Sequence, residues 1–331
     1  MTRGPLLGEV IMDGRYQLVA QVKGSVGQTK KAHLGQKGLC RFCGERDPRQ
    51  FRKIAHTFPE ALGNKWVFSF DECDGCNALF SNYENELAKA MSPFLTLGGI
   101  PGKRNNIRQT GRSAGNFVLS RRQGDDRPHI LMAAQANDWA QHISADPLTR
   151  RIRLSMPIAG VPFKPRHAYK ALMKMGTALL PSEELANFTR MRQWLRCNDD
   201  HEDFPNLEVG LSFASIANAP QLVVGTLLRR LGPADPLPYM IFIYSAGSIC
   251  LQVDLMPDSA DDHLGIMPPG RLNIRWSNVI GAPGKSDIKI DYGQPIHLNW
   301  SAWTTSPQPI ASIVLDFCLD TNAGVFTPIF R

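Results

Sequence analysis

Two pairs of cysteines, each with the spacing Cys-x-x-Cys, constrain the fold of this chain more than any other feature. They are Cys40-Arg-Phe-Cys43 and Cys73-Asp-Gly-Cys76. A Cys-x-x-Cys turn directs two thiolates at one point, and two such turns supply the four soft ligands of a tetrahedral zinc ion. Glycines at both turns tolerate the backbone angles that tight knuckles need. The sequence therefore predicts a four-cysteine zinc site, and a redox dithiol is the weaker alternative.

A zinc ion with four cysteine ligands is closed to substrate, so this site is expected to be structural. The zinc would hold the residues that lie between and after the two pairs. Residues 51–58 and 65–70 are typical of short strands, and a loop with proline and glycine separates them. Residues 77–90 have the apolar spacing of a helix. The predicted order is knuckle, strand, loop, strand, knuckle, helix.

Polar side chains on this segment suggest chemistry. Asn77 and Glu84 are seven residues apart, close to two helical turns, so they project from nearly the same line. If zinc fixes the helix to the strands, His56, Asn77 and Glu84 can face one point. Oxygen ligands suit a hard cation such as Mg²⁺ or Mn²⁺, and a neutral histidine beside it can take a proton from water. This pattern predicts a one-metal site that hydrolyses phosphodiesters.

The quoted motifs also carry a family resemblance. CRFC, the run AHTFPEALGN, and ECDGCN followed by Phe80, Glu84 and Leu87 resemble the HNH endonucleases, the zinc-stabilised branch of the ββα-metal (His-Me finger) nucleases. The resemblance covers residues 40–93. It implies that the four cysteines hold structural zinc and that His56 is the general base. It also implies that Asn77 orients the hairpin loop or binds the metal, with Glu84 where the family places a third histidine, asparagine or acid.

The chain departs from the family pattern at two positions. Ala55 stands where many members carry an acid that binds the catalytic metal, and the third position is Glu84 instead of histidine. Glu86 or Asp71 are alternative ligands. The metal ligand set is therefore open, and a module that keeps the fold without the activity is an alternative.

The charge distribution favours a polyanionic partner. The formal net charge is +7 and the sequence pI is about 9.1, with no acidic residue over residues 101–124 or 147–182. DNA is the expected partner, bound through phosphate contacts. The candidate contacts are Lys53, Lys65, Lys103, Arg104 and Arg108.

The start of the chain lacks the apolar core of a signal peptide, and no run approaches the roughly 20 apolar residues of a membrane span. We expect a cytoplasmic protein without membrane contact. Seven cysteines do not suggest a secreted disulfide scaffold. The three outside the pairs, Cys197, Cys250 and Cys318, are expected to be small buried hydrophobes.

The length of 331 residues suits two domains. We expect a mildly basic lead-in without a clear core over residues 1–37 and the nuclease module over 38–110. A basic linker and helical region should follow over 111–204, then a β-rich domain of unknown role over 205–331. Helices are predicted at 168–180 and, capped by Ser182, from there to about 195. The expected fold class is therefore α+β.

The leading hypothesis is a metal-dependent DNA endonuclease, with anti-phage defence in bacteria as a loose implication of the resemblance. One site cuts one strand, so a double-strand break would need a homodimer or two encounters. One alternative is a non-catalytic zinc-containing protein that binds nucleic acid. Another is a nuclease effector that its C-terminal region silences until a ligand or protein partner arrives.

Overall fold

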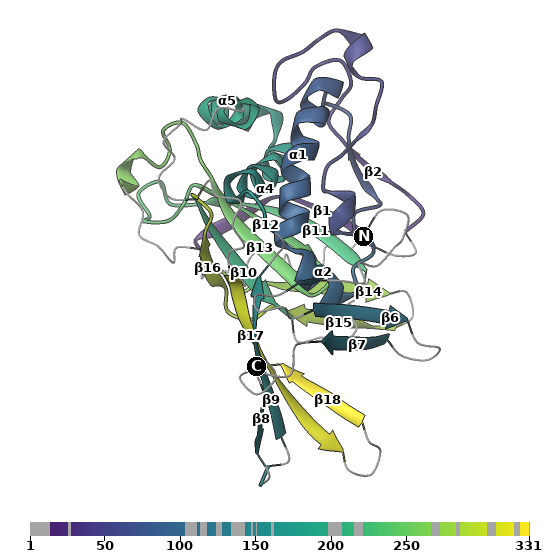
Figure 1. The fold of residues 1–331 in the computed structure, drawn as a ribbon. Helices are drawn as coiled ribbons and strands as arrows, with labels where there is room; N and C mark the ends of the chain where they lie inside the picture. Colours follow the sequence, from purple (N-terminus) through teal and green to yellow (C-terminus); the bar gives the residue numbers. More distant parts are fainter. Residues whose placement is uncertain are drawn as a thin grey trace.

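The computed structural model has a mixed α+β fold with a large antiparallel sheet (Figure 1). It describes residues 14–25, 28–102, 111–112, 118–123, 128–133, 143–146, 148–149, 151–159, 162–197, 207–214, 221–265, 272–282, 285–302, 309–320 and 325–330. Within this part of the chain, no helix has the length and apolar composition needed to cross a bilayer.

The centre of the molecule is a six-stranded sheet in which every neighbouring pair is antiparallel. In spatial order its strands are β1 (Tyr16–Ser25), β11 (Leu222–Arg230), β12 (Met240–Ala246), β13 (Ile249–Leu255), β10 (Glu208–Phe213) and β16 (Ile296–Asn299). Five of these six strands lie within residues 205–331. The β-rich character predicted for this half is confirmed.

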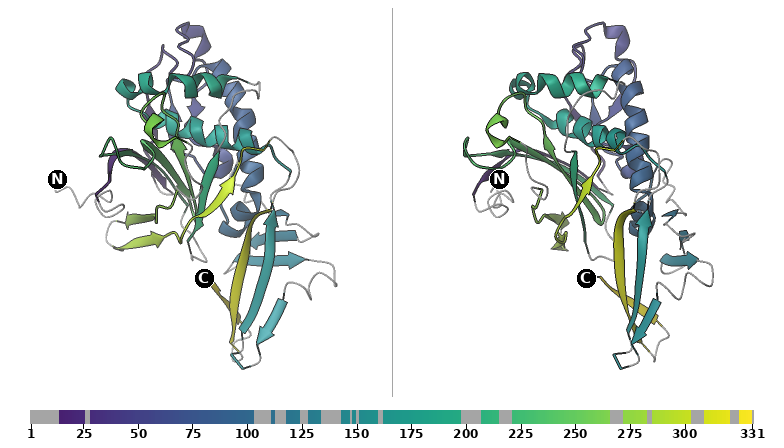
Figure 2. Two further views of the ribbon diagram at one scale, coloured as in Figure 1. Left: turned by 90° about the vertical axis from the view of Figure 1, so that its left-hand side faces the viewer. Right: turned by 60° about the vertical axis from the view of Figure 1, so that its left-hand side comes forward.

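Both faces of this sheet are buried, which explains the near-continuous apolar runs of its central strands. Along β11, Val223 and Leu227 belong to the large core cluster, whereas Val224 and Leu228 belong to a second cluster on the other face. Helix α4 (Pro165–Leu179) packs on β11, β12 and β13. The hairpin of β14 (Ser277–Ala282) and β15 (Lys285–Asp291) lies on the opposite side of the sheet (Figure 2).

The cysteine-containing segment forms a small three-stranded sheet followed by a long helix. The elements are β2 (Ala32–Leu34), β3 (Ala55–His56), β4 (Val67–Ser69) and α1 (Asp74–Ala90), with α2 (Ser92–Gly98) after it. Strand β4 is central, parallel to β2 and antiparallel to β3. The predicted order is present, but both strands are shorter than the runs 51–58 and 65–70. Short 3-10 turns, η1 (Pro48–Gln50) and η2 (Glu60–Leu62), take part of the connecting loops.

The helical region differs from expectation in one detail. Residues Ser182–Phe188 form a 3-10 helix, η4, and α5 (Thr189–Arg196) follows. The Ser182 side chain does not cap either one. Instead Asp258 accepts hydrogen bonds from the backbone N–H groups of Thr189 and Arg190, at 2.9 Å each. The free N–H groups at the start of α5 are thus satisfied from a loop far along the chain.

The remaining strands form two further sheets. One contains β5 (Gly111–Arg112), β6 (Val118–Gln123) and β7 (Pro128–Ala133). The other contains β18 (Val325–Phe330), β17 (Pro309–Asp320), β9 (Arg151–Ala159) and β8 (Ile143–Asp146), in that spatial order. The second sheet extends away from the main body (Figures 1 and 2). A short 3-10 turn, η5 (Asp262–Leu264), follows β13.

The lead-in over residues 1–37, expected to have no clear core, contributes two strands. Strand β1 pairs with β11 along its whole length, with Tyr16 opposite Arg230 and Ser25 opposite Leu222, and β2 pairs with β4. The buried Tyr16 also donates a hydrogen bond to the carbonyl of Pro238 at 2.8 Å. The N-terminal region is therefore part of the main sheet.

The cysteine-containing segment docks directly on the main sheet. The ring of Phe58 lies 5.1 Å from the ring of Tyr244, and the Tyr244 hydroxyl donates to the carbonyl of Leu62 at 3.2 Å. A Cβ at Gly225 would lie 2.3 Å from the Phe58 ring, so only glycine leaves room for it. One core cluster runs from Cys40 through α1 and α4 to Trp300. The core therefore does not break at the boundaries expected near residues 110 and 204.

Candidate functional site

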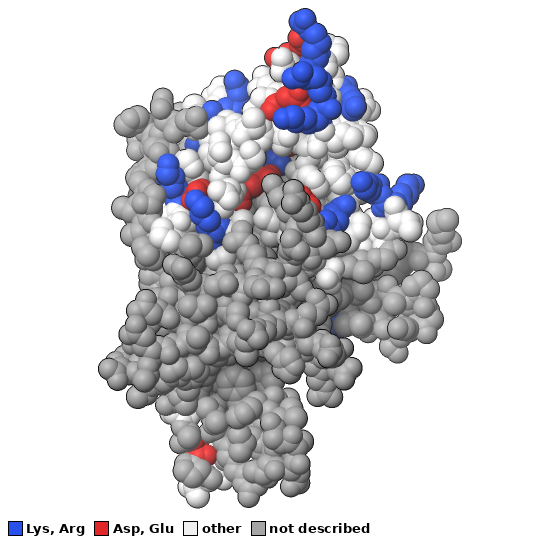
Figure 3. Space-filling view, turned by 45° about the vertical axis from the view of Figure 1, so that its right-hand side comes forward, with Lys and Arg blue, Asp and Glu red and all other residues white. Residues whose placement is uncertain are grey.

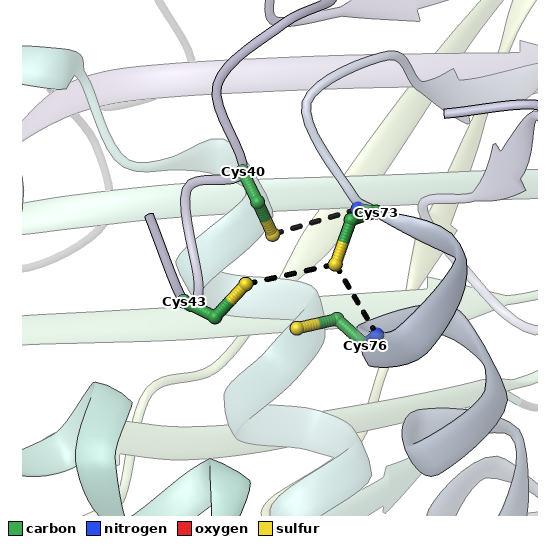
Figure 4. A group of neighbouring side chains, drawn as sticks. All are labelled: Cys40, Cys43, Cys73 and Cys76. Carbon is green, nitrogen blue, oxygen red and sulfur yellow. Dashed lines mark hydrogen bonds between the residues drawn. The ribbon is translucent and has the colours of Figure 1, made fainter. Parts of the chain in front are cut away.

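The four cysteines of the two pairs lie together and could hold a metal ion such as zinc. Their sulfurs all lie within 4.8 Å of one another and point to a common centre (Figure 4). The sulfurs of Cys43 and Cys73 are 3.6 Å apart. Zinc–sulfur bonds of about 2.3 Å in a tetrahedron place ligand sulfurs about 3.8 Å apart, so the group fits zinc. Among the described residues, this is the one such group of His, Cys, Asp and Glu side chains.

Hydrogen bonds within the group favour the thiolate form of one sulfur, that of Cys40, whereas burial raises the pKa of Cys73 to about 11. The backbone N–H of Cys73 points to the sulfur of Cys40 and that of Cys76 to the sulfur of Cys73, both at 3.5 Å. A hydrogen bond from Cys76 lowers the pKa of Cys40 to about 4, although burial opposes it. Cys73 also caps the start of α1. The second pair therefore anchors the helix on which Asn77 and Glu84 lie.

A buried ion pair joins both knuckles to α4. Arg41, inside the first pair, lies 2.6 Å from Asp71, just before the second pair. The same guanidinium donates to the carbonyls of Thr177 and Leu180 at the end of α4, at 2.8 and 2.9 Å. The C-terminal carbonyls of a helix attract a positive charge. Arg41 thus fixes the four-cysteine group to the rest of the core.

The loop between β3 and β4 is held by a buried asparagine, Asn64. Its amide nitrogen donates to the carbonyls of Phe58 and Val67, both at 2.8 Å. Its side-chain oxygen accepts from the N–H groups of Trp66 and Val67, at 3.1 and 3.0 Å. Asn64 therefore fixes the loop between β3 and β4 through four hydrogen bonds to the backbone.

His56 lies on β3, opposite Phe68 of β4, and its ring centroid is 4.7 Å from that of Phe68. The residue is half-buried, and its Nδ1 atom is buried with no hydrogen-bond partner among the described residues. Its backbone carbonyl accepts a hydrogen bond from the ammonium of Lys174 at 2.7 Å. The strand is therefore fixed by α4, whereas the imidazole is held by packing.

Burial lowers the pKa of the His56 imidazole below its ordinary value of 6.5. The nearby carboxylate of Glu60 opposes this shift. Three lysines reinforce it: Lys174, Lys65 and Lys31. His56 is therefore neutral at pH 7, the form in which an imidazole accepts a proton.

We expect the His56 imidazole to titrate below pH 6.5 in an NMR titration, with its signal assigned by comparison with His56→Gln. Because the folded-state pKa is depressed, the unfolded chain binds more protons below the unfolded value of about 6.5. The contribution of His56 to stability is therefore present above that pH and is lost as the pH falls toward the folded-state pKa. A titration midpoint at or above 6.5 contradicts this description of the site.

Glu84 lies on α1 and faces Lys174. One carboxylate oxygen of Glu84 accepts from the Lys174 ammonium at 2.9 Å. The same ammonium lies 3.1 Å from a carboxylate oxygen of Glu72. The structure thus brings His56 and Glu84 together through one lysine. Asn77 is half-buried in the first turn of α1, and its backbone N–H donates to the carbonyl of Cys73.

Lys174 and Glu72 are both fully buried at their side chains. Burial raises the pKa of Glu72 to about 7, and the Lys174 charge opposes this shift. For Lys174, burial would lower the pKa, but Glu72 and Glu84 outweigh it and raise the value above the ordinary one. Lys174 is therefore positively charged inside the core, between two acidic side chains.

The two alternative metal ligands have other partners. Asp71 forms the ion pair with Arg41. Glu86 lies 2.6 Å from the Lys89 ammonium, and its second oxygen accepts from the backbone N–H of Lys164 at 2.7 Å. Neither side chain joins His56 and Glu84 in a group of metal ligands.

The candidate phosphate contacts have different surroundings. Lys53 is exposed. Lys65 is half-buried, and its ammonium donates to Glu60 and to the carbonyl of Gly102, both at 2.6 Å. The other three candidates lie outside the described residues: Lys103, Arg104 and Arg108.

Exposed basic side chains gather at the end of the molecule that carries the cysteine turns, at the top of Figure 3, with acidic side chains among them. Between the two cysteine pairs, the exposed basic residues besides Lys53 are Arg46, Arg49 and Arg52. Asp47 and Asp74 lie 2.9 and 3.2 Å from Arg49 and Arg52. This end of the molecule therefore offers basic groups, partly neutralised, near the proposed zinc.

Lys174 was not among the predicted site residues, although the sequence indicates that it is unusual. Lys170 and Lys174 interrupt an otherwise apolar helical run, and both are buried. Charged residues are almost never buried without partners. Such lysines four residues apart on one apolar helix therefore indicate buried partners, here Glu72 and Glu84 for Lys174.

The cysteines outside the pairs are not all alike. Cys250 is buried in the second core cluster, as expected. Cys197 is exposed, contrary to expectation, because it follows the last turn of α5. The side chain of Cys318 lies outside the described residues.

No protein-family model, curated protein or solved structure matches this chain.

Proposed function

We propose that this protein is a DNA endonuclease of the HNH type, with structural zinc bound by Cys40, Cys43, Cys73 and Cys76. The observation that supports this most is the position of His56. It lies on a short strand paired with β4, and α1 begins directly after, at the second cysteine pair. The order of strand, strand and helix agrees with the resemblance in the sequence.

In this proposal the neutral His56 imidazole takes a proton from the attacking water. The resulting hydroxide forms a bond to phosphorus, and the bond from phosphorus to the leaving sugar oxygen breaks. The leaving oxygen takes up a proton from solvent, and the protonated His56 returns its proton to solvent. A positioned general base of this kind contributes about 10²–10⁴-fold to the rate. The exposed side chains of Lys53 and its basic neighbours attract the phosphate backbone, so binding weakens as salt rises.

The catalytic Mg²⁺ or Mn²⁺ expected from the sequence does not fit the residues around His56. Glu84 is engaged by the Lys174 ammonium, and Ala55 offers no ligand atom. Together with the half-buried Asn77, these positions do not form an open set of oxygen ligands. The proposed proton transfer to His56 does not require a metal ion bound by these residues.

A second candidate is a non-catalytic zinc-containing protein that binds nucleic acid. Two observations favour it: Ala55 has no metal-binding side chain, and Glu84 is hydrogen-bonded to Lys174. Both candidates include the zinc, the basic end of the molecule and the same fold. In the second candidate, His56 has no chemical role.

Binding and cleavage measured together separate the two candidates. Full-length zinc-loaded protein is mixed with fluorescent DNA, with Mg²⁺, with Mn²⁺ or with EDTA. Anisotropy reports binding and denaturing gels report cleavage. Cleaved product supports the endonuclease, whereas salt-sensitive binding without product supports the second candidate. No binding and no product contradicts both.

A further inference from the structure

Three oxygens from separate parts of the chain surround one nitrogen, the ammonium of Lys174. They are the His56 carbonyl of β3 at 2.7 Å, a Glu84 oxygen of α1 at 2.9 Å and a Glu72 oxygen at 3.1 Å. The exposed fractions of the Lys174, Glu72 and Glu84 side chains are 0%, 0% and 18%. A lysine from α4 therefore binds both the candidate base strand and the candidate metal-ligand helix.

This arrangement matches the bonding capacity of lysine. An ammonium has three N–H donors and no acceptor. This one donates to the His56 carbonyl and to Glu84, and it lies within ion-pair distance of Glu72. Two of the three oxygens belong to carboxyl groups, and carboxylate and carbonyl oxygens are also the ligands that Mg²⁺ and Mn²⁺ prefer. The oxygens around Lys174 are thus of the kind that would hold a hard cation.

The ammonium and a divalent cation cannot share these oxygens. A second cation bound to the same atoms would lie within a few ångströms of the lysine charge, inside a buried region where repulsion is strong. Mg²⁺ also demands near-octahedral coordination and gives up its waters reluctantly. Ala55, next to His56, adds no ligand that could offset this.

We propose that Lys174 is the resident cation of this site: its ammonium holds Glu72, Glu84 and the backbone of β3 in place of a divalent metal. Lys174 is a positioning residue, because its buried side chain touches no substrate. The wild-type protein then binds neither Mg²⁺ nor Mn²⁺ at Glu84. The inference concerns the site of the proposed function, but its test uses no nucleic acid, so the two can fail separately.

The test is Mn²⁺ binding to zinc-loaded full-length protein, followed by the loss of the electron paramagnetic resonance signal of free Mn²⁺. At equimolar Mn²⁺, wild type and Lys174→Arg are expected to leave the signal unchanged. Lys174→Met, which removes the charge and keeps the length, is expected to reduce it. Adding Glu84→Gln to Lys174→Met is expected to restore it.

Lys170→Met is the matched control. Lys170 is also buried on α4, but its ammonium donates to the carbonyl of Cys197 and lies over the ring of Trp194. It should gain no Mn²⁺ site. Mn²⁺ bound by wild type and lost in Glu84→Gln overturns the proposal, whether or not the Lys174 variants fold. A folded Lys174→Met that binds no Mn²⁺ also overturns it, because these oxygens then form no cation site.

Discussion

Replacing Cys73 with serine is expected to abolish zinc binding and to cause the largest loss of stability of any single change in this chain. Cys73 supplies one sulfur of the four-cysteine group and also caps α1. We expect a loss of about 4–5 kcal/mol or more, the range in which removal of a bound metal falls. The free energy of binding of a structural zinc also stabilises the fold, because the unfolded chain has no formed site.

Zinc content by elemental analysis and urea unfolding check this prediction. Cys197→Ser is the matched control, because Cys197 is exposed and lies outside the group. It should keep the zinc and the unfolding midpoint of wild type. A Cys73→Ser protein with one equivalent of zinc and unchanged stability would show that the four cysteines bind no zinc.

The second large effect is expected from Lys174→Met. Removing the ammonium leaves Glu72 and Glu84 without their buried counter-charge. Breaking a buried ion pair by removing one partner costs about 3–5 kcal/mol. Lys170→Met loses a hydrogen bond to the carbonyl of Cys197 and a cation–π contact with Trp194, and a smaller loss of about 1–3 kcal/mol is expected.

Urea unfolding of both lysine variants at pH 7 gives the comparison. The order of stability should be wild type, then Lys170→Met, then Lys174→Met. If Lys174→Met is as stable as Lys170→Met, the three oxygens around Lys174 do not depend on its charge.

The parts of the site that the sequence predicted are governed by local spacing. The Cys-x-x-Cys turns fix their own sulfurs, and the apolar spacing after Cys76 predicts α1. His56 was placed on a strand because proline and glycine mark the loop after it. In each case, the residues that decide the structure are close together in the sequence.

The missed features depend on contacts between distant residues. Lys174 is 90 positions from Glu84, and only the packing of α4 on α1 brings them together. Strand β1 was not predicted, and it pairs with β11, which lies far along the chain. The sequence pattern assigns no role to Asn64, whose hydrogen bonds to Phe58 and Val67 hold the loop in the folded chain. Contacts between distant residues depend on how the helices and sheets pack, and local sequence patterns do not predict them.

The central functional claim is that His56 is a general base. The most direct measurement is the single-turnover rate of DNA cleavage by His56→Ala relative to wild type, at equal zinc content and under the same metal conditions. His263→Ala is the control, because it removes an exposed histidine of η5. The account predicts a rate at least about 100-fold lower for His56→Ala and an unchanged rate for His263→Ala. Equal rates for His56→Ala and wild type would contradict it.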